Sequence, residues 1–166
     1  MTQDYSIETQ FIHPPGHGDE TGATSFPIYQ TASYAHDDPQ TLSDIFNGRQ
    51  FGYSYTRIAN PTVTYLEQHI NAIDKGRGCV AVSTGMAALS TIVDALSAAG
   101  DHLISSNSIF GGSYYLFNEF KEHNGLDISF VEGADIAAYK KAIKPNTKAI
   151  FCEVIGNPKL DIPDLK

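Results

Sequence analysis

The stretch from Cys79 to Leu96 constrains the fold most, because a short apolar run passes through a tight turn into a helical pattern. Val80 to Val82 predict a strand, and Ser83-Thr84-Gly85 predict the turn. Apolar residues then recur at three- and four-residue spacing, which predicts a helix: Met86, Leu89, Ile92, Val93 and Leu96. Such a turn aims backbone N–H groups and the positive end of a helix dipole at an anion. Many strand-to-helix turns bind nothing, so the stretch alone leaves both interpretations open.

Further along the chain, short apolar runs alternate with helical patterns. Strands are expected at residues 101–106, 127–131 and 148–154, with helices at 114–123 and 134–143. With residues 80–82 this makes four strands, and the last run reads as a buried parallel strand. The alternation predicts an α/β fold with a mostly parallel sheet covered on both faces. Polar groups follow the strand ends and are expected to meet at one crevice: Ser83 to Met86, Ser106 to Gly112, and Glu153 with Asn157.

The N-terminal part has a different character. Residues 1–22 are polar and rich in Gly, Pro and His, which predicts an extended arm. A metal site in this arm is disfavoured because its candidate ligands lack a rigid frame: His13, His17, Asp19 and Glu20. Residues 25–34 predict an extended surface segment, and residues 39–47 a short helix that stops at Gly48.

A second helix start lies downstream of an aromatic loop. Asn60 is a good N-cap, Pro61 suits the first helical position, and a helix is expected over residues 61–74. Lys75-Gly76 is expected to end it, with the glycine in the left-handed conformation. Tyr55 and Arg57 therefore lie on the loop just before a helix. An Arg there can hold a phosphate or carboxylate, or can simply be solvated beside packed tyrosines.

Composition narrows the function classes. The 166 residues carry a net charge of −8 and no long basic cluster, which disfavours nucleic acid and anionic membranes as partners. No apolar run is long enough to span a bilayer, and the first residues lack signal-peptide features, so we expect a cytoplasmic protein. Cys79 and Cys152 lie in apolar runs without metal-site spacing, and we expect buried, reduced thiols.

Four motifs occur in order along the chain: Tyr55-Thr-Arg57 with Asn60-Pro-Thr62, Ser83-Thr-Gly-Met-Ala-Ala88, Phe110-Gly-Gly-Ser113, and Glu153-Val-Ile-Gly-Asn-Pro-Lys-Leu160. Together they resemble the Cys/Met-metabolism family of pyridoxal-phosphate (PLP) enzymes, from about Thr9 to the last residue. The resemblance implies the fold-type-I, aspartate aminotransferase-like α/β architecture. Residues 1–59 would form an arm and extended segment that reach a neighbouring subunit, and residues 60–166 the first part of the PLP-binding domain.

The resemblance also implies a role for each matching residue. Gly85 and Met86 would offer backbone N–H groups to the PLP phosphate. Phe110 would stack on the pyridine ring, where the family often has Tyr; Phe keeps the stacking and lacks the hydroxyl. Asn157 would hydrogen-bond the phenolic oxygen of PLP, and Glu153 would line the same pocket. These five residues make up the part of the expected cofactor site that lies in the α/β domain.

Two further residues complete the expected site. Tyr55 and Arg57 would reach across a dimer interface to the phosphate bound by the neighbouring subunit, within a homodimer or homotetramer that shares its active sites. No metal is implied. The family's Schiff-base lysine and the Asp that pairs with the pyridine nitrogen would lie beyond Lys166, so no catalytic residue is assigned here. Residues 161–166 resemble the first turn of a further helix, and we expect these 166 residues alone to be inactive.

The segments quoted above are most similar to O-acetylhomoserine sulfhydrylases. That similarity implies γ-replacement on O-acetylhomoserine with sulfide or a thiol, giving homocysteine or methionine plus acetate. Three alternatives stay open: a cystathionine γ-synthase, a methionine or cystathionine γ-lyase, or a non-catalytic chain that acts in dimerisation or complementation. A Rossmann-type nucleotide site is disfavoured, because Ser83-Thr-Gly-Met86 lacks the spaced glycines of that motif.

Overall fold

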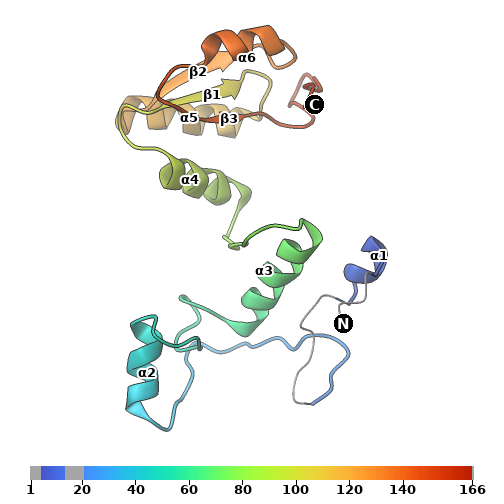
Figure 1. The fold of residues 1–166 in the computed structure, drawn as a ribbon, viewed down its shortest axis with the longest axis vertical. Coiled ribbons are helices and arrows are strands. Elements are labelled where there is room, and N and C mark those ends of the chain that lie inside the picture. The colour runs from blue at the N-terminus through green and yellow to red at the C-terminus, as the bar shows by residue number, and fades with distance from the viewer. Residues whose placement is uncertain (1–4, 14–20, 166) are drawn as a thin grey trace. The chain divides into compact units, whose positions relative to one another are not determined.

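The computed structural model describes residues 5–13 and 21–165 (Figure 1). The chain divides into two compact units, Met1–Ala81 and Val82–Lys166. Each unit is described by itself below. The functional division at residues 59 and 60, which the resemblance implies, stays a prediction.

The second unit is built on a parallel sheet of three strands: β1 (His102–Ser106), β2 (Asp127–Val131) and β3 (Thr147–Phe151). The order is β2-β1-β3, so β1 pairs with both neighbours. All five residues of β1 are buried. The predicted α/β fold with a parallel sheet is therefore confirmed, and β1 is its centre.

Helices cover both faces of this sheet. The helices α4 (Gly85–Leu96) and α5 (Gly111–His123) share one hydrophobic core with β1 and β2. That core contains Leu89, Val93, Leu103, Ile109, Phe117, Phe120, Leu126 and Ile128. The helix α6 (Ile136–Ala142) packs on β2, and Figure 1 shows it on the opposite face of the sheet from α5. Burial of these large apolar side chains, each contributing roughly 1.5–3 kcal/mol, holds the layers together.

Two strand predictions were wrong in part. Residues 80–82 form no strand, and Val80 is 78% exposed, because no strand among the described residues pairs with this segment. The run at 148–154 is a shorter strand, β3, and it alternates between half-buried and exposed residues instead of being buried throughout. Ile150 is 50% exposed, because β3 is an edge strand of this sheet. A continuous apolar run predicts burial only where a neighbour covers it.

The first unit contains α1 (Ile7–Gln10), α2 (Pro39–Phe46) and α3 (Pro61–Ile73). The predicted Asn60 cap is confirmed, because its side chain accepts from the Thr62 N–H at 2.9 Å. Asp38, which the sequence analysis did not single out, caps α2 in the same way by accepting from the Gln40 N–H at 2.9 Å. Gly48 has the left-handed φ of +66° expected after α2. After α3, however, Lys75 has the positive φ (+53°) that was predicted for Gly76. A glycine is needed at position 76 for a different reason: a Cβ there would clash with the Asn71 side chain, at 2.7 Å from its Oδ1.

Asn60 also ties the extended segment to the aromatic loop. Its side-chain Nδ2 donates to the Tyr29 carbonyl oxygen at 2.9 Å, and the residue is only 5% exposed. An antiparallel bridge joins Ser33 to Tyr55. Among the described residues, every buried large hydrophobic side chain lies in the second unit. The first unit is thus held by hydrogen bonds between distant segments and by ring contacts such as that of Phe26 with Tyr65 at 4.2 Å, and its described part has no buried apolar core of its own.

Several remaining predictions concern the ends of the chain and the cysteines. Of the disfavoured metal ligands, His17, Asp19 and Glu20 lie outside the described residues, and His13 is exposed. No helix starts between Asp161 and Leu165. Cys79 and Cys152 are free, as expected, although both are half-buried instead of fully buried. None of the described helices is long and apolar enough to cross a membrane.

One fully buried side chain connects all three strands. His102, the first residue of β1, lies 2.7 Å from the Thr147 hydroxyl through Nδ1 and 2.9 Å from the Ser129 hydroxyl through Nε2. Burial lowers the pKa of His102 below its usual 6.5, and the Lys144 charge adds to this, while Asp127 opposes it. The neutral imidazole is therefore the form that the sheet holds.

This gives a pH-dependent stability. Because the folded pKa lies below 6.5, the unfolded chain binds more protons as the pH falls from about 6.5 through the folded pKa. The free energy of unfolding should fall in that window, and His102→Gln, which can donate and accept without titrating, should remove this part of the fall. Denaturant unfolding of the intact protein at pH 7.5 and pH 5 measures it. His123→Gln, at an exposed position, is the control; equal pH slopes for wild type and His102→Gln would contradict the account.

Candidate cofactor site

The predicted anion site is the first turn of α4. The Thr84 hydroxyl caps the helix by accepting from the Ala87 N–H at 3.0 Å, and the Thr84 carbonyl accepts from Ala88 N–H at 3.0 Å. Within the described residues, the amides of Gly85 and Met86 have no acceptor. Gly85 is exposed and Met86 is half-buried, and a Cβ built on Gly85 would meet nothing within 4 Å. Two amides and the helix dipole together favour an anion here.

The fold brings this helix end to the ligand side of the sheet. A tight turn follows α4, in which the Asp101 side chain accepts from the Ala98 N–H at 2.9 Å, and β1 begins at once. Leu89 and Val93 pack against Leu103, so α4 runs back along β1 in the opposite direction. Its N-terminus therefore lies at the same end as the carboxyl ends of the strands, as the arrowheads in Figure 1 show. In open α/β sheets this is where ligands bind.

The second glycine-rich turn lies between β1 and α5. Phe110 stands at the N-cap of α5 and provides no side-chain cap. Instead, the Glu153 carboxylate accepts from the Phe110 N–H at 2.9 Å. The Phe110 ring is 49% exposed and folds over Gly112, where a Cβ would lie 2.5 Å from a ring carbon. A Cβ on Gly111 would meet nothing within 4 Å.

The loop after β3 carries the other predicted residues. Gly156 is buried against Ser108, since a Cβ there would lie 2.5 Å from both the carbonyl and the hydroxyl oxygen of Ser108. The Gly156 carbonyl accepts from the Leu160 N–H at 2.9 Å, which closes a turn. Asn157, at the tip of this turn, is exposed, and its side chain has no hydrogen bond within the described residues. It is free to donate to a ligand.

The structure thus brings together Phe110 and Glu153 directly, and places Asn157 on an adjoining turn. Ser108 is a member of this group that the sequence did not single out. Its hydroxyl is buried without a partner in the described chain. A serine in a polar loop gives no such signal, because only the packing of Gly156 against it reveals the contact.

A charged network that the sequence did not predict lies near the carboxyl ends of the strands. Glu132, just after β2, accepts from the Asn107 side-chain amide at 3.0 Å and pairs with Lys159 at 3.8 Å. The Lys159 and Glu132 side chains are 58% and 56% exposed, so this ion pair contributes little to stability. It connects the ends of all three strands through exposed side chains.

Tyr55 and Arg57 belong to the first unit. Both are exposed, and the Arg57 guanidinium carbon lies 5.4 Å from the centre of the Tyr55 ring. No ion pair involves Arg57 within the described residues. The Ser33–Tyr55 bridge and the buried Asn60 fix the loop between them. The pair therefore presents a cation and an aromatic hydroxyl from an ordered loop.

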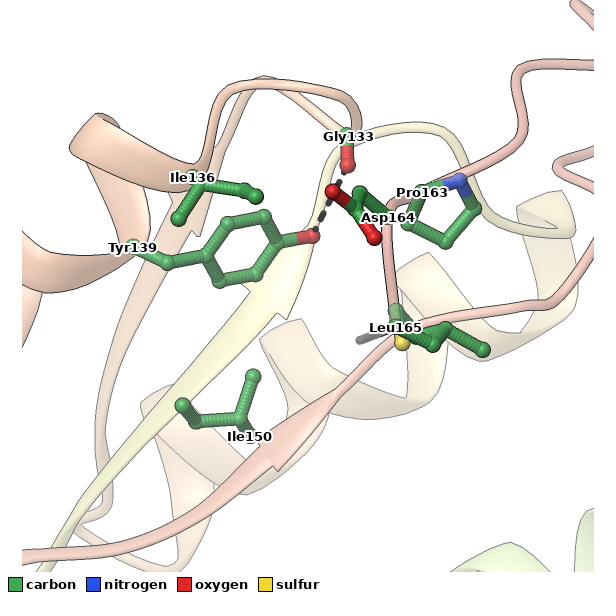
Figure 2. A pocket seen from close by; sticks show the side chains of 8 residues that line it. Gly133, Ile136, Tyr139, Ile150, Pro163, Asp164 and Leu165 are labelled. Carbon is green, nitrogen blue, oxygen red and sulfur yellow. Dashed lines mark hydrogen bonds between the residues drawn. The ribbon is translucent and has the colours of Figure 1, made fainter.

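An apolar hollow lies on the α6 face of the sheet (Figure 2). Ile136 and Tyr139 of α6, Ile150 of β3 and the segment at Asp164 line it. The Tyr139 hydroxyl donates to the Gly133 carbonyl at 3.4 Å, and burial raises the pKa of Tyr139, so the phenol stays neutral. None of the predicted cofactor residues lines this hollow.

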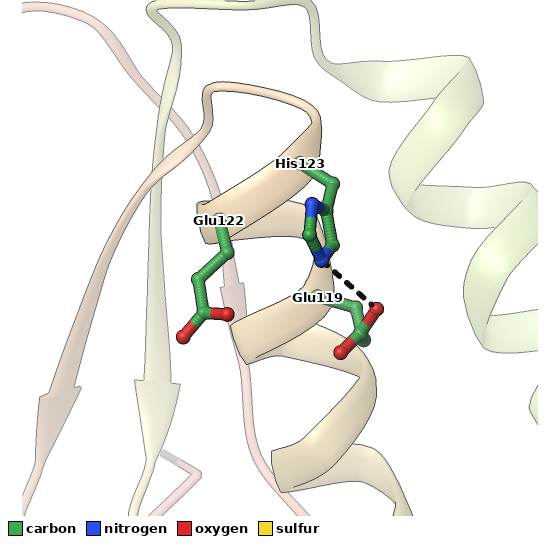
Figure 3. Close-up of side chains that lie close together, drawn as sticks. All are labelled: Glu119, Glu122 and His123. Atoms are coloured by element: carbon green, nitrogen blue, oxygen red, sulfur yellow. Dashed lines mark ion pairs between the residues drawn. The ribbon is translucent and has the colours of Figure 1, made fainter.

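Three potential metal ligands gather near the C-terminal end of α5: Glu119, Glu122 and His123 (Figure 3). His123 Nε2 lies 3.5 Å from a Glu119 carboxylate oxygen, an ordinary pair one helical turn apart. The hydrogen bond to Glu119 and the charge of this carboxylate raise the pKa of Tyr115, one turn earlier. Partners on the helix surface explain these positions, so we assign no metal site to them.

Comparison with known proteins identifies one enzyme family. The Cys/Met metabolism PLP-dependent enzyme family matches residues 8–166. The chain is 36% identical over 163 residues to an O-acetyl-L-homoserine sulfhydrylase of Corynebacterium glutamicum, covering 97% of this chain and 37% of that protein. It is 40% identical over 159 residues to a cystathionine gamma-lyase of Bacillus subtilis, covering 95% and 40%.

A solved structure agrees with these relatives. A crystal structure of an O-acetylhomoserine (thiol)-lyase from Campylobacter jejuni, which contains N'-pyridoxyl-lysine-5'-monophosphate, superposes with a TM-score of 0.88. It is 31% identical, and the match covers 97% of this chain and 40% of that one. The chain spans about two fifths of the length of the relatives that it matches.

Proposed function

Because this chain belongs to the family of Cys/Met metabolism PLP-dependent enzymes, we propose that the intact protein catalyses γ-replacement on O-acetylhomoserine. Sulfide or a thiol replaces the acetate, giving homocysteine or methionine. The relatives named sulfhydrylases support this choice. The observation that supports PLP as the cofactor is the first turn of α4, where the amides of Gly85 and Met86 have no acceptor among the described residues and Gly85 is exposed.

The residues present fit the cofactor. The amides of Gly85 and Met86 bind the phosphate, the half-exposed Phe110 ring stacks on the pyridine ring, and the Asn157 amide donates to the phenolic oxygen. When bound, PLP withdraws electrons from the substrate and so allows its γ-substituent to leave. Phe110 orients the ring and moves no proton, because it has no hydroxyl. The lysine that carries the cofactor in this family is not assigned to any residue of this chain.

The structure favours α4 over α5 as the phosphate site. Both helices begin after a turn that contains glycine, and both lie at the ligand edge of the sheet. At α5, however, the Glu153 carboxylate already accepts from the Phe110 amide. A second anion there would be repelled by this charge, whereas no carboxylate among the described residues bonds to the first turn of α4. This difference supports our assignment of the phosphate to Gly85 and Met86.

We also propose that Tyr55 and Arg57 act on the phosphate bound by a second subunit, in a homodimer or homotetramer. An exposed Arg without an ion-pair partner on an ordered loop is suited to bind a phosphate. The first unit also exposes large apolar side chains on this loop and on α3, including Ile58 (64%) and Leu66 (50%). Surfaces of this kind are often interaction sites.

A substrate comparison tests the reaction. The intact protein, saturated with PLP, should form homocysteine and acetate from O-acetylhomoserine plus sulfide at least tenfold faster than it forms 2-oxobutyrate from cystathionine or methionine alone. Product analysis by mass spectrometry measures both. Faster elimination would identify a γ-lyase, for which the 40% identity to the Bacillus subtilis enzyme is the supporting observation. Absence of any turnover with bound PLP would favour a non-catalytic role.

The ring contact gives a second test. Gly112→Ala places a Cβ 2.5 Å from the Phe110 ring and must displace it, while Gly111→Ala meets nothing within 4 Å. We expect Gly112→Ala to weaken PLP binding by roughly 3- to 10-fold, the value of one aromatic stacking contact. Absorbance titration of the intact protein with PLP measures this. Gly111→Ala is the matched control in the same helical turn, and equal affinities for the two variants would refute the stacking role.

The phosphate contact gives a third test. Arg57→Ala should weaken PLP binding by about tenfold, because it removes a charge-assisted contact to phosphate. Arg49→Ala, an exposed Arg that pairs with Asp44 at 3.5 Å, should leave the affinity unchanged. Adding an excess of subunits that keep Arg57 but lack the Gly85 site should restore binding if the contact crosses the interface. Failure of this mixing would show that Arg57 serves its own subunit.

A further inference from the structure

The loop after β1 and the loop after β3 contact each other at two points. The first is the hydrogen bond from the Phe110 N–H to the Glu153 carboxylate at 2.9 Å. The second is the packing of Gly156 on Ser108, which is steric, because the Ser108 hydroxyl has no hydrogen-bond partner there. Within residues 21–165, the Phe110–Glu153 bond is the only direct hydrogen bond between these loops.

The first loop depends on Glu153 because it cannot cap its own helix. Phe110 occupies the N-cap of α5 without a side-chain oxygen, and the next two residues, Gly111 and Gly112, have no side chains. The capping-box pattern is absent from this turn, because the N-cap Phe110 has no hydroxyl and the third helical residue is Ser113, not Glu or Gln. The acceptor comes instead from a residue 43 positions away. The position of the α5 N-terminus therefore depends on the position of the loop after β3.

We propose that Glu153 is a positioning residue that fixes Phe110 relative to Asn157 and so sets the geometry of the ring site. The identity of the ligand in this proposal, PLP, rests on the proposed function. The proposal changes the role of Glu153 from lining the cofactor pocket to holding the loops that form the pocket. Three residues from Glu153, the buried Gly156 fixes the turn whose next residue is Asn157. The carboxylate thus connects the two loops that carry the two ligand-facing side chains.

The hydrogen bond has the chemistry that such a role needs. A carboxylate that accepts from a backbone N–H makes a charge-assisted bond, and a negative charge at a helix N-terminus is favoured by the dipole. Glu153 is half-buried, so water competes less for its oxygens than at an exposed site. By contrast, the indirect connection from Asn107 through Glu132 to Lys159 runs through exposed side chains at 3.8 Å. It should contribute little to loop position.

Two variants separate position from charge. Glu153→Gln keeps the length of the side chain and a carbonyl oxygen that can accept from the Phe110 N–H, but it loses the charge. Glu153→Asp keeps the charge but is one methylene too short to reach the amide without a shift of the backbone. A positioning role predicts that Gln is the better substitute, and a direct electrostatic role on the cofactor predicts that Asp is. Lys159→Ala, in the exposed connection, is the control.

The experiment uses the intact protein, with and without PLP. Without PLP, hydrogen exchange of the peptide covering residues 107–113 should be about tenfold faster in Glu153→Asp than in wild type. It should be only about threefold faster in Glu153→Gln, which keeps the hydrogen bond and loses its charge assistance, and unchanged in Lys159→Ala. With PLP, the affinity and the circular dichroism of the bound cofactor should follow the same order. Unchanged exchange in Glu153→Asp, or a larger loss in Glu153→Gln, would overturn the proposal. Because the exchange is measured without cofactor, a wild type that fails to bind PLP would refute the proposed function and leave this test intact.

Discussion

The burial of β1 between two parallel partners is the constraint on which the second unit depends. All five of its residues are buried, with β2 in continuous register on one side, β3 with one register shift between His102 and Leu103 on the other, and α4 and α5 packed on one face. Parallel pairing places the carboxyl ends of the three strands at one edge. Asn107, Glu132 and Glu153 follow those ends and engage in contacts there. The site is thus a consequence of the sheet more than of any single motif.

Two helix starts of similar sequence acquire different roles at this edge. The first turn of α4 is capped by its own Thr84, which leaves the amides of Gly85 and Met86 for a ligand. The start of α5 has no cap of its own and receives the Glu153 carboxylate. The same physical need, acceptors for unpaired amides, is met locally in one case and from a distant loop in the other. Only the locally capped helix stays open to an anion.

Local chemistry explains which predictions succeeded. Asn60 caps α3 as predicted, with Pro61 at the first helical position, because capping depends on residues within one turn. The predictions for residues 80–82 and for the burial of β3 were wrong, because a strand needs a neighbour that local sequence does not reveal. Lys75 took the left-handed conformation assigned to Gly76, whose own requirement is space beside Asn71.

The sequence by itself determined the fold class, the starts of α2 and α3 and the family, because periodicity, caps and ordered motifs are written in residues close together along the chain. It missed α1, which lies in the arm predicted to be extended, and the first three residues of α5. It also pointed to Gly85, Met86, Phe110, Glu153 and Asn157 as one site, on the strength of their resemblance to known motifs. Only the tertiary structure decided that Glu153 bonds to the Phe110 amide, that Ser108 supports Gly156, and that His102 joins three strands. Each of these contacts joins residues separated by at least 27 positions, and such pairs meet only when the strands between them have taken their order in the sheet.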